Sequence, residues 1–253
     1  MKQIIKRSSF SSRPILLVSV VNGQEARAAA AGGADIIDLK NPAEGSLGAP
    51  TPQIIGEVCA ALKGDKPLSI ALGEFPGKPG AAALAALGSA YFQPNFIKIA
   101  FMPDSPQKEI LAALKEIRTG IRLMQQEKTI NLVSVAFADI MNRGIWDLAD
   151  FAAVSQEGGA AGCLIDTWEK KGRSLLDYLS EREIGQFIKV CHDHQLFCGL
   201  AGSLQSSHIC ALHQLGPDII GVRSAVCGGN RLQGRVSAQS VRDLKELCCR
   251  TNN

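Results

Sequence analysis

The sequence predicts a single (β/α)8 barrel, or TIM barrel, and three observations carry that prediction. Short runs of apolar and β-branched residues recur eight times, and each is followed by a loop and an Ala/Leu-rich stretch with helical spacing. Strict alternation of strands and helices requires a parallel sheet with helical crossovers. The length of 253 residues fits one such barrel, whose typical size is about 250 residues.

The elements follow one another without an internal linker. The predicted strands cover residues 15–21, 35–40, 68–72, 96–101, 131–137, 162–166, 197–201 and 218–223. The predicted helices cover residues 23–31, 52–62, 81–90, 106–127, 145–156, 174–178 leading into 184–194, 207–215 and 238–249. Eight strands favour closure, because their inward side chains just fill a barrel. A Rossmann-type sheet would need a Gly-rich turn after its first strand, and that position offers only Gly23. We therefore expect one domain over residues 1–253, with a basic extension at 1–13 and a polar tail at 250–253.

Composition narrows the class of protein. A content of 46% hydrophobic and 20% charged residues is ordinary for an α/β protein and argues against disorder. The net charge of +3 is too balanced for a nucleic-acid binder but compatible with a positive pocket for a small anion. Eight cysteines without a CxxC spacing predict reduced thiols in a cytoplasmic protein. The apolar run at 15–21 is too short to span a membrane, so we expect no membrane anchor and no secretion signal.

Charged residues recur at the carboxyl ends of predicted strands, where barrel enzymes place their reacting groups. In the second strand, period-two alternation puts Asp38 and Lys40 on one face and Ile37 and Leu39 on the other. In the fourth strand, Lys98 lies between two isoleucines and would enter the same interior. Burial beside another cation lowers the pKa of an amine, which makes it a nucleophile or base near neutral pH. The alternative is that Asp38 and one lysine form a structural ion pair at the barrel rim.

Further polar groups would surround these lysines. Asp166 ends the sixth strand and would serve as a counter-ion or proton carrier. Lys170 follows in the next loop, where it would either reach over the mouth or stay solvated. The aspartates could ligate a divalent cation, but the lysines would compete for them, and His192 and His194 do not share a helix face. We therefore expect no metal site.

Small residues follow the strands at which barrels commonly bind phosphate. Lys78 lies in a Pro/Gly-rich loop after the third strand, which either brings the lysine to a phosphate or is simply a stiff turn. The loops after the seventh and eighth strands commonly hold a phosphate on backbone N–H groups. The candidate residues there are Gly202, Ser203, Arg223, Gly228 and Gly229. The pattern predicts a small phosphorylated substrate.

The segment GADIIDLKNPAEGSLG at residues 33–48 resembles the (5-formylfuran-3-yl)methyl phosphate synthase family. The likeness extends over nearly the whole chain after Arg13, through residues 78–80, 96–98, 164–167, 201–204 and 221–223. The resemblance implies a barrel enzyme, a lyase, that condenses two molecules of glyceraldehyde 3-phosphate into a furan aldehyde phosphate, with loss of phosphate and water. It also implies a role in the biosynthesis of a methanofuran-type one-carbon carrier.

The resemblance implies roles for the polar residues as well. Lys40 would form a Schiff base with the substrate and Lys98 would accept a proton, while Asp38, Asp166 and Lys170 would move further protons, with no cofactor. The loop at 224–227 reads SAVC and departs from the family pattern at its first and third positions, which bears on the phosphate contacts. Two alternatives stay open, namely a class I aldolase acting on another phosphosugar and a non-catalytic barrel that binds a phosphorylated metabolite. A homo-oligomer is compatible with the sequence.

Overall fold

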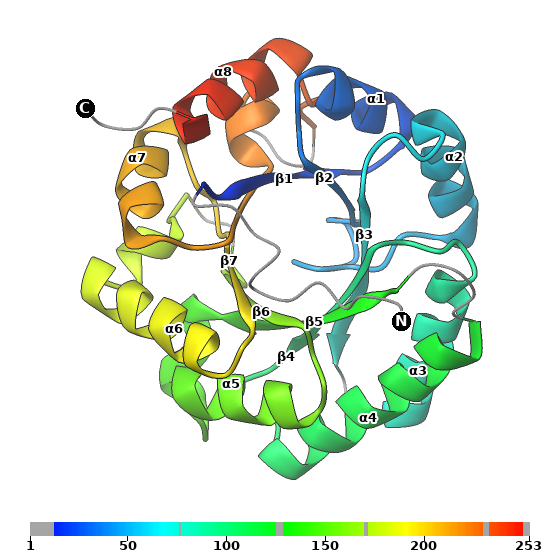
Figure 1. Ribbon diagram of the computed structural model, residues 1–253, viewed down its shortest axis with the longest axis vertical. Coiled ribbons are helices and arrows are strands. Elements are labelled where there is room, and N and C mark those ends of the chain that lie inside the picture. The colour runs from blue at the N-terminus through cyan, green and yellow to red at the C-terminus, as the bar shows by residue number, and fades with distance from the viewer. Residues whose placement is uncertain (1–12, 76, 125–128, 170–171, 230–232, 250–253) are drawn as a thin grey trace.

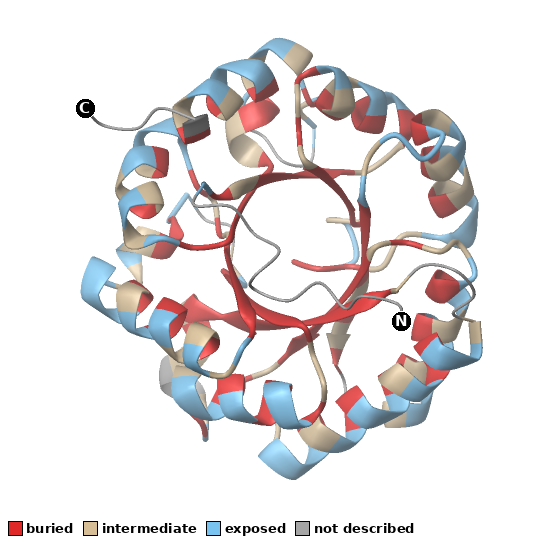
Figure 2. Ribbon diagram, in the orientation of Figure 1, coloured by how far each residue is buried: buried red, intermediate tan, exposed pale blue. Residues whose placement is uncertain are grey.

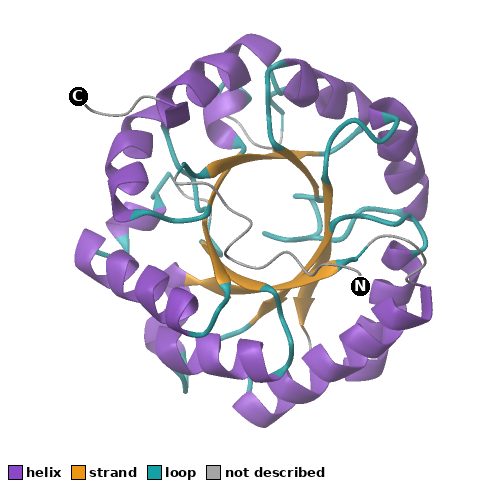
Figure 3. Cartoon of the chain, in the orientation of Figure 1, coloured by secondary structure: helices purple, strands orange, loops and turns teal. Residues whose placement is uncertain are grey.

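Eight parallel strands close into a barrel in which each strand pairs with its neighbours in sequence and β1 pairs with β8. The structure is a computed structural model that describes residues 13–75, 77–124, 129–169, 172–229 and 233–249. The helices form a layer outside the ring of strands (Figures 1 and 3). The predicted (β/α)8 barrel is therefore confirmed.

The elements alternate along the described chain. The strands are β1 (Ile15–Val20), β2 (Ile36–Leu39), β3 (Leu68–Phe75), β4 (Phe96–Phe101), β5 (Asn131–Phe137), β6 (Gly162–Asp166), β7 (Phe197–Leu200) and β8 (Ile219–Val222). The α-helices are α1 (Gly23–Ala31), α2 (Pro52–Leu62), α3 (Pro79–Ala90), α4 (Gln107–Met124), α5 (Leu148–Glu157), α6 (Glu181–Asp193), α7 (Ser206–Leu215) and α8 (Ala238–Cys249). Three short 3-10 helices are η2 (Ala138–Arg143), η3 (Leu175–Asp177) and η4 (Ser224–Val226).

Capping side chains explain where two helices differ from the prediction. The predicted start of the sixth helix, residue 184, lies inside α6, because the Ser180 side chain accepts the N–H of Glu183 and begins the helix three residues earlier. The predicted start at residue 145 is too early, because Asp147 caps α5 through the N–H groups of Ala149 and Asp150. In both cases a polar residue satisfies N–H groups that the helix itself cannot.

The third strand is longer than predicted. It continues through Glu74 to Phe75, past a break in its register with β4 between Ala71 and Glu74. Such an irregularity bends a strand and redirects its side chains. As a result Glu74 is part of the barrel wall, whereas the sequence predicted that it belongs to the following loop.

Alternation along the strands separates two apolar cores. Outward residues such as Ile37, Ile97 and Ile165 pack under the helices. Inward residues such as Phe96 and Leu164 fill the barrel interior. The strand ring is buried except for a few half-buried residues of β1 and β3, while exposed residues lie mainly on the outer faces of the helices (Figure 2). Because parity fixes the direction of every side chain on a strand, the residues that alternate with the outward isoleucines must face the interior.

Tight packing in the barrel floor makes the inward Gly162 a sensitive position. A Cβ atom there would lie 2.3 Å from the ring of Phe197, which itself packs edge-on against Phe96. We expect Gly162→Ala to lower the free energy of unfolding by about 1–3 kcal/mol through overpacking. The control is Gly88→Ala in α3, where nothing lies within 4 Å, and which should raise that free energy by about 0.5–1 kcal/mol. Urea unfolding measures both, and equal effects of the two variants would contradict the packing argument.

Candidate active site

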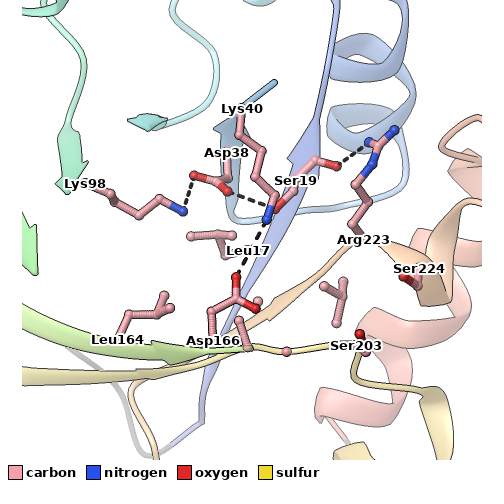
Figure 4. Close-up of a pocket in the computed structure, with 14 residues that line it drawn as sticks. Leu17, Ser19, Asp38, Lys40, Lys98, Leu164, Asp166, Ser203, Arg223 and Ser224 are labelled. Carbon is pink, nitrogen blue, oxygen red and sulfur yellow. Dashed lines mark hydrogen bonds and ion pairs between the residues drawn. The ribbon is translucent and has the colours of Figure 1, made fainter. Parts of the chain in front are cut away.

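Two lysine–carboxylate pairs meet at the carboxyl end of the barrel (Figure 4). Lys98 Nζ on β4 lies 2.6 Å from Oδ1 of Asp38 on β2. Lys40 Nζ, directly after β2, lies 3.7 Å from Oδ2 of Asp166 at the end of β6. All four residues are buried. The prediction that Asp38, Lys40 and Lys98 face one interior, with Asp166 beside them, is therefore confirmed as geometry.

Asp38 is the most enclosed of these groups. Its Oδ2 accepts a hydrogen bond of 2.8 Å from the Ser19 hydroxyl on β1. Burial alone raises the pKa of this carboxyl, but the charges of Lys98 and Lys40, with hydrogen bonds from Lys98 and Ser19, outweigh it and hold the pKa below its usual value. Asp38 is therefore an anion near neutral pH.

The four residues line one narrow cavity of about 30 Å³. Its other lining residues include Gly202 and Ser203 after β7 and Arg223 after β8. A larger hollow of about 610 Å³ between α5 and α6 is lined mainly by apolar side chains and contains none of the lysine pairs. We place the site in the smaller cavity, because that is where charged groups converge in a buried environment.

The loop after β7 approaches the end of β6 closely. Gly202 has a φ of +111°, and a Cβ atom there would lie 2.9 Å from the Thr167 methyl group. Ser203 also has a positive φ, of 49°, which is uncommon for a residue other than glycine and clusters at functional sites. The structure thus brings the two predicted phosphate-binding residues of this loop to the cavity.

Arg223 lines the cavity but is held by a carboxylate. Its Nη1 lies 2.8 Å from Oε2 of Glu25 in α1 and donates to the backbone oxygen of Ser19 at 3.0 Å. Glu25 also accepts the backbone N–H groups of Val21 and Val236. The guanidinium charge is therefore balanced by Glu25, and the pair ties the end of β8 to β1 and α1.

Other predicted site residues lie elsewhere. Gly228 and Gly229 are exposed in the turn after η4, and Lys78 is exposed at the N-cap of α3; none of the three lines the cavity. Lys170 lies outside the described residues. Their predicted roles stay predictions.

Sequence reasoning missed several polar residues that organise the site. Ser19 shares the inward face of β1 with Leu17, so period-two alternation could have found it. No local sequence pattern indicates the role of Glu25, because its partner Arg223 is 198 residues away. Asp139 in η2 is a third such residue, since its carboxylate accepts the N–H groups of Trp168 and Glu169 at 2.6 Å each and so holds the loop after β6.

In the part of the chain that the structure describes, no group of three or more His, Cys, Asp or Glu side chains could hold a metal ion. No helix there is both long and apolar enough to traverse a lipid bilayer.

Comparison with known proteins identifies the family. The family model described as 4-HFC-P synthase matches residues 16–245. The (5-formylfuran-3-yl)methyl phosphate synthase of Methanocaldococcus jannaschii is 36% identical over 235 residues, which cover 92% of this chain and 99% of the relative. The chain belongs to the 4-HFC-P synthase family. The synthase of Methanopyrus kandleri is 37% identical over 235 residues, covering 92% of this chain and 98% of the relative. The predicted resemblance is therefore confirmed.

Solved structures add evidence on the fold of this 4-HFC-P synthase family member. KGPDC from Streptococcus mutans matches with a TM-score of 0.64 and 11% identity, covering 94% of this chain and 98% of that chain. Phosphoribosyl anthranilate isomerase from Thermus thermophilus matches with a TM-score of 0.61 and 13% identity, covering 93% and 98%. At these identities the likeness concerns the fold alone.

The depressed pKa of Asp38 predicts a pH-dependent stability. A carboxyl group whose pKa is lower in the folded state stabilises it above the unfolded pKa, and this stabilisation is lost as pH falls through the folded pKa. We expect Asp38→Asn to cost about 3–5 kcal/mol at pH 7, because it leaves the Lys98 ammonium buried and unpaired. The gap between wild type and variant should narrow as pH falls below about 4. Denaturant unfolding from pH 7 to 3 measures the gap.

A matched control is Ser69→Ala. Ser69 is in register with Asp38 on β3, as Ser19 is on β1, but its buried hydroxyl has no hydrogen-bond partner among the described residues. This variant should change the free energy of unfolding by less than about 0.5 kcal/mol at every pH, since no bond is lost. If the difference in unfolding free energy between wild type and Asp38→Asn stays constant over this pH range, the lowered pKa of Asp38 is contradicted.

Proposed function

We propose that the protein is a cytoplasmic (5-formylfuran-3-yl)methyl phosphate synthase that serves the biosynthesis of a methanofuran-type carrier. Its substrate is glyceraldehyde 3-phosphate, and the reaction passes through a Schiff base on Lys40. The observation that carries this proposal is the pair of buried lysines, Lys40 and Lys98, each beside a carboxylate in one cavity. Membership of the 4-HFC-P synthase family supports the same product.

The lysine pairs suit two different tasks. We assign Lys40 as the nucleophile because it lines the cavity directly after β2 and has the carboxylate of Asp166 3.7 Å from its Nζ, where it can take up the proton of the amine. Lys98 acts first as the proton donor, since its Nζ lies 2.6 Å from the anionic Asp38 and lines the same cavity as Lys40. Lys98 protonates the departing hydroxyl as the imine forms and becomes neutral. It then removes the proton from the carbon next to the imine.

The remaining steps are carbon–carbon bond formation and elimination. The enamine on Lys40 loses its phosphate group, and the enol that remains attacks a carbonyl carbon of a second triose phosphate through the terminal carbon that carried the phosphate. Loss of this phosphate and of two molecules of water balances two trioses against one furan aldehyde phosphate. Asp166 accepts and returns protons in these steps, and the backbone of Gly202 and Ser203 receives a phosphate group.

Borohydride trapping tests the assignment of Lys40. We expect sodium borohydride with glyceraldehyde 3-phosphate to leave a reduced adduct on Lys40, located by peptide mass spectrometry, because an imine is reduced to a stable amine. Lys40→Met should lose both the adduct and furan formation. The control is Lys115→Ala, an exposed lysine on α4, which should behave as wild type. An unmodified Lys40 in protein that binds the substrate would overturn the mechanism and favour a non-catalytic barrel.

A separate variant tests the role of Lys98. We expect Lys98→Met to lower kcat by about 10²–10⁴-fold, the usual contribution of a general acid–base group, while the Lys40 adduct still forms slowly. Product analysis accompanies the rate, because a class I aldolase would give a sugar phosphate without phosphate release. Full activity of Lys98→Met would remove Lys98 from the chemistry.

A further inference from the structure

The segment that follows Lys40 does not leave the barrel directly for α2. The N–H of Asn41 donates to the backbone oxygen of Gly48 at 2.7 Å, so residues 41–48 form a loop with a closed neck. We call residues 41–48 the mouth loop. In Figure 1 the light-blue trace between β2 and α2 extends into the ring of strands.

The mouth loop spans the barrel opening. The Ser46 hydroxyl donates to the backbone oxygen of Thr167 at 2.9 Å, directly after β6, which lies across the eight-stranded ring from β2. The N–H of Leu47 donates to Oε1 of Glu74 on β3 at 2.8 Å. The Leu47 side chain is 0% exposed and belongs to the apolar cluster of the barrel interior. The loop therefore plugs part of the mouth and does not merely cover it.

Two glycines allow this close approach. Gly45 has a φ of +152°, and a Cβ atom there would lie 2.5 Å from Oε2 of Glu74. A Cβ atom on Gly48 would lie 2.2 Å from the backbone oxygen of Asn41. A side chain at either position would force the loop away from the wall or open its neck. The spacing of glycines in the segment EGSLG thus has a physical reason.

The cavity takes its lining from most of the ring but not from β3, which contacts the mouth loop. The cavity lining comes from β1, β2, β4 and β6 and from the ends of β7 and β8, whereas no described residue of β3 or β5 contributes to it. Glu74 of β3 is instead occupied with Leu47. Lys40 and Lys98 are only 7% and 4% exposed, and the mouth loop begins at the residue directly after Lys40.

The proposed reaction forms an intermediate that can react either with water or with the second substrate molecule. The inference drawn from this competition rests on the proposed function. When the enamine on Lys40 loses its phosphate group, the carbon–oxygen bond to phosphate breaks and a conjugated imine remains. If water attacks that imine, Lys40 departs and 2-oxopropanal is released. One triose phosphate then yields one 2-oxopropanal and one phosphate, with no oxidant or reductant required. Capture of the second triose avoids this loss.

We propose that Ser46 and Leu47 are specificity-determining residues that exclude water from the Lys40-bound intermediate. The Ser46 bond to Thr167 keeps the loop across the mouth, and Leu47 fills the space through which water would reach the imine. Phosphate release is thereby coupled to carbon–carbon bond formation. Closed loops that sequester reactive intermediates from water serve this purpose in other enzymes.

The test measures phosphate, furan and 2-oxopropanal from glyceraldehyde 3-phosphate, with an enzyme-free blank subtracted. Wild type should release one phosphate per furan. Leu47→Ala should raise that ratio by about fivefold or more, and Ser46→Ala, which loses only one hydrogen bond, by about twofold, with 2-oxopropanal as the excess product. The control is Leu212→Ala, a fully buried leucine of α7 in the outer core, which should keep the ratio at one.

Each outcome bears on the inference. A ratio of one in folded Ser46→Ala and Leu47→Ala overturns it, and so does an equal rise in Leu212→Ala, which would assign the leak to lost stability. If Leu47→Ala does not fold, the ratio of Ser46→Ala decides. A wild type that forms no furan refutes the proposed function, and the inference falls with it, whereas furan formation with unchanged variant ratios refutes the inference alone.

Discussion

The buried contact between Asp38 and Lys98 is the interaction on which the site depends. An isolated charge inside a barrel would be expensive, and each partner is tolerable only because the other is 2.6 Å away. Ser19 satisfies the second oxygen of Asp38, and Lys40 adds a further positive charge nearby. The floor of the barrel is apolar, so these charges gather at the carboxyl end, where the lining is polar.

The strands around this contact are held by a second buried pair. Glu25 and Arg223 join α1, the end of β1 and the end of β8, which is the seam where the first and last strands close the barrel. Arg223 reaches the backbone of Ser19, the residue whose hydroxyl supports Asp38. The closure of the barrel and the orientation of the Asp38 carboxylate therefore rely on adjoining groups. Arg223 is therefore paired with the Glu25 carboxylate, although it directly precedes the loop for which the sequence predicted phosphate contacts.

The Schiff-base reaction proposed for Lys40 also requires that the site be enclosed. Amines and carboxylates interact more strongly where water is excluded, and reactive imines survive longer there. The mouth loop begins at the residue after Lys40, so the strand that positions this lysine also continues into the segment that spans the barrel opening. Asp139 performs a related task on the opposite side by fixing two N–H groups of the loop after Asp166.

The sequence alone determined the barrel and the inward direction of Asp38, Lys40 and Lys98, because strand periodicity is local and survives without tertiary information. Two predicted helix starts differ from the structure by a few residues, because the capping side chains of Asp147 and Ser180 set where α5 and α6 begin. What only the tertiary structure decided are contacts between distant segments, such as Glu25 with Arg223 and Ser46 with Thr167, which are separated by 198 and 121 residues. No local pattern encodes such pairs, because they arise only when closure of the barrel brings segments that are distant in sequence together.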